Sequence, residues 1–369
     1  MKKIVFGITS LGLGGAERVL VDIVNEICDK YEITIFALYG NGEFEKQLDK
    51  KVKFVSVYKE SFNEISFMKR KWISLQMICS NLRKKIYDKY IKDKFDVEIA
   101  FLEGPITWIM SEDSKAKKIV WVHNDIEDVF GKDKGSSVKQ KMNKKCYTKY
   151  DNLVFVSKDN MKKFKKYFPD VKADMQVIYN YLNTDSVKEK AKEFKVDDII
   201  NKKKVSFVQV SRLVDQKAVL RLLDVHKKLI SDGFEHNIYI VGDGPLRGEL
   251  ESKIKEYGVE DSFILLGKKE NPYPYIKAAD YFMLMSYYEG YPMVLLEGKA
   301  LNKYILITDS AARETLIGYN DSKIVKNNEK GIYEGIKDIV KNKPKALKKN
   351  KDMNKEILNE VISLIDGEV

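Results

Sequence analysis

Short apolar runs alternate along the chain with segments of helical periodicity. The first half has a helical segment at about 16–29, and its strand-like runs lie at 3–8, 33–37, 97–101, 118–122 and 153–156. Strands buried on both faces of a sheet read as continuous apolar runs, and crossover helices separate them in the sequence. This alternation therefore predicts a parallel sheet covered by helices.

The same pattern restarts after a charged stretch at 183–203. Strand-like runs follow at 205–210, 238–241, 263–266, 281–285 and 304–308, with helices at about 220–231, 246–257 and 293–301. We therefore expect two doubly wound α/β domains, 1–181 and 204–345, joined by a linker at 182–203. Ligands of such open sheets bind beyond the carboxyl ends of the strands, so we expect the active site in the crevice between the domains.

Length, charge and cysteine content restrict the domain number, the partners and the cellular compartment that we expect. The 369 residues exceed what one hydrophobic core usually organises, and the net charge of +11 favours anionic partners such as nucleotide sugars, acidic lipid surfaces or nucleic acid. Cys28, Cys79 and Cys146 are far apart and lack metal-ligand spacing, which predicts a reduced cytoplasmic protein without disulfides. No apolar run approaches the roughly 20 residues of a membrane-spanning helix, so any membrane contact would be peripheral.

Lysine-rich segments flank a group of apolar residues between Phe67 and Ile78, and they recur from Lys132 to Lys166. One interpretation is a solvated helix face. The other is peripheral docking onto an anionic membrane, because basic and aromatic side chains together suit the membrane interface.

The strongest chemical pattern runs from Glu289 to Glu297. Proline is favoured in the first turn of a helix, so Pro292 predicts a helix start and leaves the amides at 293–295 free to face a phosphate. Glu289 would lie on the loop and Glu297 further along the helix. They are too far apart to share a proton, but each can accept hydrogen bonds from sugar hydroxyls; two purely structural glutamates are the alternative.

A second pattern places two cations directly after a strand. The run 208–210 ends before Ser211-Arg212, and Lys217 follows five residues after Arg212. A guanidinium and an ammonium there would stabilise the charge on a departing diphosphate. Two ordinary surface cations are the alternative.

Together these motifs resemble those of retaining glycosyltransferases of family 4. That family has the GT-B fold, in which two Rossmann-like domains face an interdomain cleft. The resemblance is carried by Gly14–Arg18, Trp121–Asp125, Ser211–Leu213 with Lys217, Gly242–Leu246, Glu289–Glu297 as the E-x7-E element, and Thr308 to Glu314.

The resemblance implies roles for five side chains. Arg212 and Lys217 would hold the donor diphosphate, and Glu297 would hold the ribose hydroxyls. Glu289 would contact the transferred sugar, and His123 would face that sugar from the first domain. Four of them, His123, Glu289, Arg212 and Lys217, would make up the catalytic set.

Glycines and helix amides complete the implied substrate site. Gly14 and Gly15 would let the first loop approach the substrates closely, and Gly267 would leave room for the base. The remaining implied positions are Gly242, Gly290, Tyr291, Met293, Val294 and Leu295. Ser211 departs from the family, in which many members have glycine before the arginine. The metal-binding Asp-x-Asp element is absent, so we expect Arg212, Lys217 and helix amides in place of a divalent ion.

The expected protein is thus a metal-independent hexosyltransferase that uses a nucleotide diphosphate sugar, with UDP favoured, and needs no cofactor. Its acceptor would be a glycan, on a lipid carrier by preference, in cell-envelope synthesis. In GT-B enzymes a final helix often returns to the first domain, which we expect of residues 346–369. A nucleotide sugar epimerase and a noncatalytic envelope-assembly or nucleic-acid-binding protein are the alternatives. The paired cations and glutamates argue against the noncatalytic alternative, and no basic recognition helix or zinc-finger spacing appears.

Overall fold

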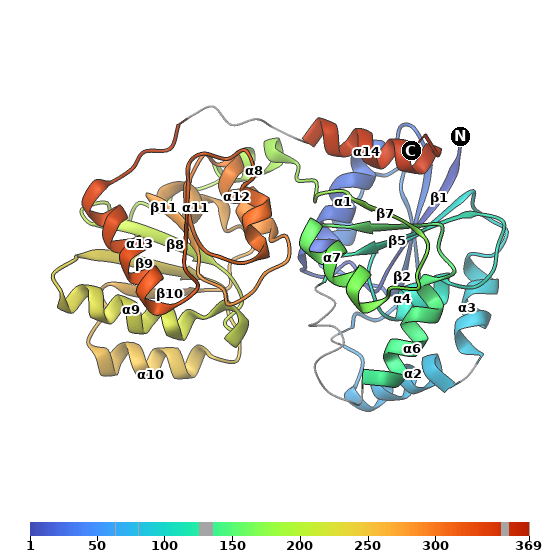
Figure 1. Ribbon diagram of the computed structural model, residues 1–369, viewed down its shortest axis with the longest axis horizontal. Coiled ribbons are helices and arrows are strands. Elements are labelled where there is room, and N and C mark those ends of the chain that lie inside the picture. Colours follow the sequence, from blue (N-terminus) through green and yellow to red (C-terminus); the bar gives the residue numbers. More distant parts are fainter. Residues whose placement is uncertain (63, 80, 125–135, 348–353, 369) are drawn as a thin grey trace. The chain divides into compact units, whose positions relative to one another are not determined.

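A computed structural model describes residues 1–62, 64–79, 81–124, 136–347 and 354–368, which form two α/β units (Figure 1). Unit 1 comprises Met1–Tyr181 with Met353–Val369, and unit 2 comprises Leu182–Asp352. The stretch 182–203, expected as a linker, thus lies in unit 2, where it contains helix α8 (Thr184–Lys190).

The sheet of unit 1 has seven parallel strands in the order β3-β2-β1-β4-β5-β6-β7. The strands are β1 (Lys3–Ile8), β2 (Glu32–Tyr39), β3 (Lys53–Tyr58), β4 (Val97–Ala100), β5 (Lys117–Val122), β6 (Asn152–Phe155) and β7 (Asp174–Val177). The five central strands match the predicted apolar runs, and the edge strands β3 and β7 were not predicted.

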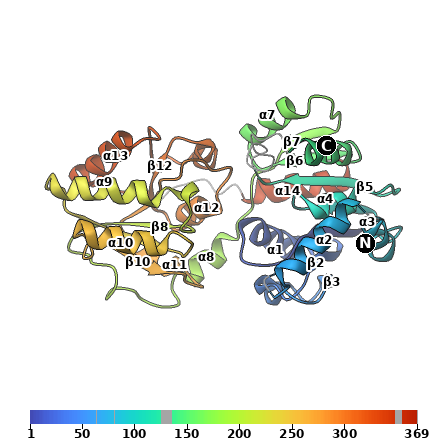
Figure 2. The ribbon, with the colours of Figure 1, turned by 90° about the horizontal axis from the view of Figure 1, so that it is seen from below.

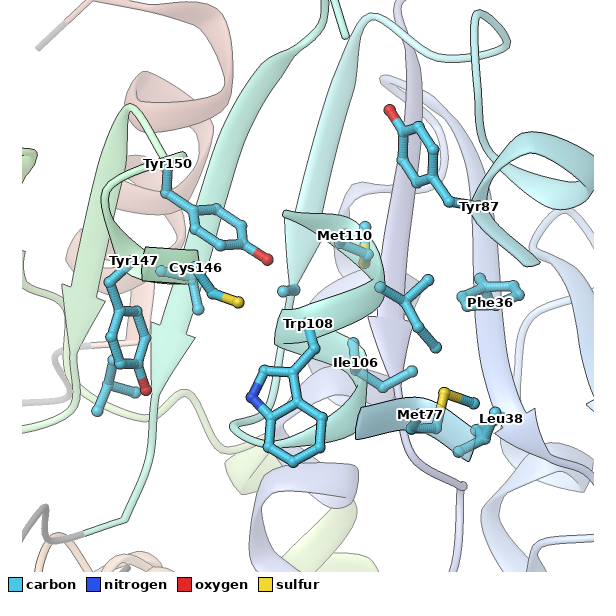
Figure 3. Close-up of a cluster of buried hydrophobic side chains, with 14 of the residues drawn as sticks. Phe36, Leu38, Met77, Tyr87, Ile106, Trp108, Met110, Cys146, Tyr147 and Tyr150 are labelled. Atoms are coloured by element: carbon cyan, nitrogen blue, oxygen red, sulfur yellow. The ribbon is translucent and has the colours of Figure 1, made fainter. Parts of the chain in front are cut away.

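Helices cover both faces of this sheet. One face carries α2 (Phe67–Cys79), α3 (Leu82–Tyr90), α4 (Pro105–Met110), α6 (Ser136–Tyr147) and α7 (Lys158–Tyr167). Their inward side chains form one hydrophobic cluster around Trp108, Met110 and Tyr147 (Figure 3). Helices α1 (Gly15–Ile27) and α14 (Asn354–Asp366) lie side by side elsewhere on the unit (Figures 1 and 2).

Polar contacts attach α14 to unit 1. Asp366 near its end accepts from Lys2 at 3.1 Å and from Lys30 at 2.7 Å. The ammonium of Lys117, at the start of β5, donates to the carbonyl of Leu364 at 2.5 Å. The buried side chains Ile357, Val361, Leu364 and Ile365 supply the apolar side of this contact.

The sheet of unit 2 has six parallel strands in the order β10-β9-β8-β11-β12-β13. They are β8 (Val205–Val210), β9 (His236–Val241), β10 (Phe263–Gly267), β11 (Tyr281–Leu284), β12 (Tyr304–Thr308) and β13 (Ser322–Val325). Helices α9 (Val219–Ser231), α10 (Arg247–Tyr257) and α13 (Glu329–Asn342) share one core with the sheet. Helix α8 packs instead with α11 (Tyr273–Ala278) and α12 (Met293–Ala300).

Candidate active site

The predicted donor residues of unit 2 lie on loops that leave the carboxyl edge of its sheet. Strands β8 and β11 are neighbours in the sheet. The loop after β8 carries Arg212 and Lys217, and the loop after β11 carries Glu289 and leads into α12. Because parallel strands end at the same edge, this topology brings both predicted motifs to one place.

The two loops are joined by an ion pair. The ammonium of Lys217 donates to Oε1 of Glu289 at 2.5 Å, and the hydroxyl of Ser286 donates to the same oxygen at 2.5 Å. The side chains are largely buried, with 15% of Lys217 and 7% of Glu289 exposed. Both contacts use the same carboxylate oxygen, Oε1.

Backbone contacts hold the Glu289 loop from several elements. The amide of Tyr287 donates to the carbonyl of Gln216 at 2.9 Å. The hydroxyl of Thr308, at the end of β12, donates to the carbonyl of Ser286 at 2.7 Å, and Nδ2 of Asn327 donates to the carbonyl of Tyr287 at 2.7 Å. The position of Glu289 is therefore fixed by residues from three other segments of unit 2.

The buried side chain of Arg221 in α9 also contacts this loop. Its guanidinium Nη2 donates to the carbonyl of Met285 and to Oδ1 of Asn327, each at 2.8 Å. The ring of Tyr287 lies 4.1 Å from the guanidinium carbon, within cation–π range. Sequence analysis did not identify Arg221, because a buried arginine in an amphipathic helix has the same pattern as an ordinary charged helix position.

Arg212 and the start of α12 present positive potential at the same edge. Arg212 is exposed, and its guanidinium pairs with no residue that the structure describes. Helix α12 starts at Met293, with Pro292 as the N-cap and no side-chain cap, so the amides of Met293 and Val294 remain available to an anion. The amide of Leu295 donates instead to the carbonyl of Pro292 at 3.1 Å. Glu297 lies buried one turn further along α12 and accepts from the hydroxyl of Tyr273 at 3.3 Å.

The predicted residues Gly290, Tyr291, Val294 and Leu295 lie on the same loop and first helical turn. Gly290, Tyr291 and Val294 are partly exposed, whereas Leu295 is buried. The side chain of Leu295 therefore packs into the core, and its amide is not free to face a phosphate as the sequence analysis expected.

Gly242 allows the loops after β8 and β9 to touch. Its φ is +148°, and a Cβ atom there would lie 1.9 Å from the carbonyl oxygen of Ser211. The amide of Gly242 donates to the carbonyl of Gly267 at 2.9 Å, and the amide of Leu213 donates to that of Asp243 at 3.0 Å. The Arg212 loop is thus supported by backbone that only glycine can supply.

In unit 1, His123 follows β5 at the carboxyl edge of the sheet. Its ring lies 4.8 Å from that of Phe101, and its Nε2 is buried without a hydrogen-bond partner among the described residues. Burial lowers the pKa of His123 to about 3, so the ring is neutral at pH 7. Asp125, the last residue of the predicted motif, lies outside the described residues.

Glu103 is a site residue that the sequence analysis missed. Its carboxylate accepts from the amide of Asn124 at 2.7 Å and from Nδ2 of Asn124 at 3.0 Å, which holds the segment that carries His123. Burial raises the pKa of Glu103 to about 7, against the opposing effect of these hydrogen bonds. The sequence feature that could have identified Glu103 is its position just after β4, the strand that pairs with β5.

Gly14 and Gly15 of the first loop form the start of α1. Gly14 is the N-cap in an extended conformation, and Gly15 is the first helical residue. A Cβ on Gly14 would lie 2.0 Å from a carboxylate oxygen of Glu17, so glycine lets that side chain fold back over the helix start. Burial raises the pKa of Glu17.

The other two histidines form a buried pair that the sequence analysis did not anticipate. Nδ1 of His226 lies 3.0 Å from Nε2 of His236, and Nε2 of His226 lies 2.9 Å from the hydroxyl of Ser262. Burial lowers the pKa of His226 to about 2 and that of His236 to about 4. His236 begins β9, so the pair lies at the amino edge of the sheet, opposite the candidate site.

Within the described ranges, no group of three or more histidine, cysteine, aspartate or glutamate side chains is arranged to hold a metal ion. Over the same residues, no helix is both long and apolar enough to cross a membrane. Cys28 and Cys146 are buried free thiols.

Comparisons with known proteins indicate which proteins the chain is similar to. Residues 190–358 match the family model of glycosyl transferases group 1. The fold is that of GT-B glycosyltransferases: HepE of Anabaena in complex with UDP superposes with a TM-score of 0.73 at 15% identity over all of both chains. WaaG, a glycosyltransferase involved in lipopolysaccharide biosynthesis, gives a TM-score of 0.65 at 13% identity over 98% of this chain and 95% of that chain. Family match and fold together support a GT-B glycosyltransferase.

Two curated relatives come from Campylobacter jejuni. One is N-acetylgalactosamine-N,N'-diacetylbacillosaminyl-diphospho-undecaprenol 4-alpha-N-acetylgalactosaminyltransferase, 28% identical over 92% of this chain and 90% of the relative. The other, an alpha-1,4-N-acetyl-D-galactosaminyltransferase whose name specifies a diNAcBac-PP-undecaprenol glycan, is 25% identical over 97% and 92%.

Proposed function

We propose that this chain is a retaining, metal-independent hexosyltransferase of family 4 that moves a sugar from a nucleotide diphosphate sugar to a lipid-linked glycan of the cell envelope. The observation that carries the proposal is the Lys217–Glu289 ion pair at the carboxyl edge of unit 2, beside the exposed Arg212 and the uncapped start of α12.

The donor diphosphate would bind to Arg212, Lys217 and the first amides of α12. Lys217 uses one of its three N–H donors on Glu289, so two remain for phosphate oxygens. Glu297 would accept from the ribose hydroxyls, and Glu289 from a hydroxyl of the transferred sugar. The structural neighbour HepE was crystallised with UDP and with UDP-glucose, which supports a nucleotide sugar and favours UDP.

The chemistry would be a front-face displacement. The bond from the anomeric carbon to the diphosphate oxygen breaks, the acceptor oxygen bonds to that carbon on the same face, and the acceptor proton passes to the departing phosphate. Arg212 and Lys217 stabilise the charge that builds on the leaving group. Glu289 is held by Lys217 and Ser286, an arrangement that suits binding and leaves it a poor nucleophile.

The acceptor would bind to unit 1, where neutral His123 would face the transferred sugar. The two Campylobacter relatives carry undecaprenol-linked substrates in their names, which supports a lipid-linked acceptor. Such an enzyme would work in the cytoplasm, at the inner face of the cell membrane.

The test replaces the proposed phosphate ligands. Arg212→Ala and Lys217→Ala should weaken UDP binding measured by calorimetry and slow UDP release in the presence of acceptor by roughly a hundredfold to a thousandfold each. Lys255→Ala, an exposed lysine on α10, is the matched control and should change neither quantity.

Full turnover by a folded Arg212→Ala or Lys217→Ala protein would remove the phosphate site from the proposal. Conversion of a donor sugar to its epimer without acceptor and without UDP release would identify a nucleotide sugar epimerase instead.

A further inference from the structure

Helix α2 is apolar on two opposite sides. Its inner side is formed by Ile73 and Met77, both buried in the unit 1 core. Met77 packs in one cluster with Leu38 and Ile106 (Figure 3). These contacts account for the attachment of α2 to the sheet.

The outer side of α2 exposes large apolar side chains. The exposed fractions are 68% for Phe67, 74% for Met68, 57% for Trp72 and 58% for Leu75. At 3.6 residues per turn, these positions fall within an arc of about 140° that is centred opposite Ile73 and Met77. We call these four residues the outer apolar face. A helix that is apolar on both sides is normally buried on both, so this face is suited to an apolar partner.

A lysine lies within this face, which belongs to a basic segment of the chain. Lys71 lies one turn after Phe67 and one turn before Leu75, within the same arc, and no carboxylate among the described residues pairs with it. Lys69 pairs with Glu60 at 3.0 Å. From Lys59 to Lys94 the chain has ten lysine and arginine residues against four acidic ones. The chain segment that carries the outer apolar face therefore has a net positive charge, and Lys71 lies within the face itself.

We propose that the outer apolar face docks into the interface of a lipid bilayer that contains anionic lipids. A short helix with apolar side chains on one side and lysines at their edge lies in the plane of such an interface, and the lysine stems bring their ammonium groups to the headgroup phosphates. Each basic residue near an anionic surface adds to the attraction. With no membrane-spanning helix among the described residues, the contact is interfacial.

Charge disfavours a second copy of the chain as the partner. In a two-fold dimer the same patch would face itself, which would bring Lys71 and its basic neighbours close to their own symmetry mates. The cores of protein interfaces are also depleted in lysine. The inference deepens the proposed lipid-linked acceptor by naming a membrane partner, but it rests on α2 and does not require the assigned donor site.

Tryptophan reports the contact directly. The chain has three tryptophans, of which Trp72 is 57% exposed while Trp108 and Trp121 are 8% and 1% exposed. Vesicles of phosphatidylcholine and phosphatidylglycerol with brominated acyl chains should quench and blue-shift the Trp72 emission and leave the other two unaffected. Trp72→Phe should abolish this quenching while the protein still sediments with the vesicles.

Two variants test the surface itself by sedimentation with the same vesicles. Phe67→Ser/Leu75→Ser should weaken partition into the vesicles by roughly tenfold or more, because two apolar side chains that would enter the bilayer are removed. Lys71→Glu should weaken it by a similar factor at low salt, and less as salt rises. Leu347→Ser, with the same 68% exposure as Phe67 but in unit 2, and Lys255→Glu are the matched controls and should bind as wild type.

Equal binding of the wild type and Phe67→Ser/Leu75→Ser would overturn the proposal, as would absence of binding by the wild type. A dimer in lipid-free sedimentation equilibrium that Phe67→Ser/Leu75→Ser dissociates, with no vesicle binding, would assign the face to a second copy. UDP binding is measured on every variant. Unchanged UDP affinity with lost vesicle binding separates the membrane contact from the donor site, so either proposal can fail without the other.

Discussion

A buried ion pair between β4 and β5 offers a quantitative test of how unit 1 holds its site. Glu98 and Lys118 are register partners on the two strands that lead to Glu103 and His123. The ammonium of Lys118 lies 2.6 Å from Oε2 of Glu98, and their side chains are only 5% and 1% exposed. The hydroxyl of Tyr87 donates to the same carboxylate at 2.9 Å.

Lys118→Met would leave the Glu98 carboxylate buried, with Tyr87 as its remaining side-chain donor among the described residues. Removing one partner of a buried pair costs about 3–5 kcal/mol, a large part of the roughly 5–15 kcal/mol that stabilises a whole domain. Glu98→Gln/Lys118→Met removes both charges and keeps an oxygen that can accept from Tyr87. We expect this double variant to recover more than half of the loss.

The assay uses the position of the tryptophans. Trp72, Trp108 and Trp121 all lie in unit 1, so urea unfolding followed by tryptophan fluorescence reports this unit alone. Destabilisation by less than about 1 kcal/mol in Lys118→Met would show that the buried carboxylate is not costly. A double variant as unstable as Lys118→Met would show that lost packing, rather than charge, sets the cost.

Two further predictions concern the site. Since the folded-state pKa of Glu103 is raised to about 7, the folded protein binds more protons than the unfolded chain between about pH 4.5 and 7, and stability falls as pH rises through this window. Glu103→Gln should remove about 2–3 kcal/mol of this fall between pH 5 and pH 8, measured by urea unfolding at each pH; parallel profiles for variant and wild type would contradict it. Gly242→Ala, whose Cβ would collide with the carbonyl of Ser211, should destabilise unit 2 by about 2 kcal/mol or more in circular dichroism melts and weaken UDP binding. Gly248→Ala on α10, where a Cβ meets open space, is the control and should be neutral or stabilising; equal melting of both variants would count against the collision.

The fold followed closely from the hydrophobic pattern where the strands are central. Strands such as β1 and β8 are buried on both faces and therefore read as continuous apolar runs. The strands β3, β7 and β13 were missed because they are partly exposed and polar residues shorten or interrupt their apolar runs, whereas the edge strand β10 was predicted from its continuous apolar run. The helix α8 was missed for a similar reason, since seven residues with four charged side chains show little periodicity.

The site was predictable where a motif is local. Lys217 and Glu289 were named from their positions after two strands, and the sheet topology brings them into contact. Glu103 and Arg221 were not identified because their roles depend on partners that are distant in the sequence. Nothing around either residue indicates which strand end or loop its side chain will reach.

The C-terminal helix α14 has a consequence for biosynthesis. Its apolar residues and Asp366 complete unit 1, yet they follow the entire sequence of unit 2. On the ribosome, the first 181 residues emerge long before α14, so the surface that α14 will cover stays exposed while unit 2 is translated. Unit 2 can therefore complete its folding before unit 1 does. During that interval, chaperones can bind the apolar surface of unit 1 that α14 will cover.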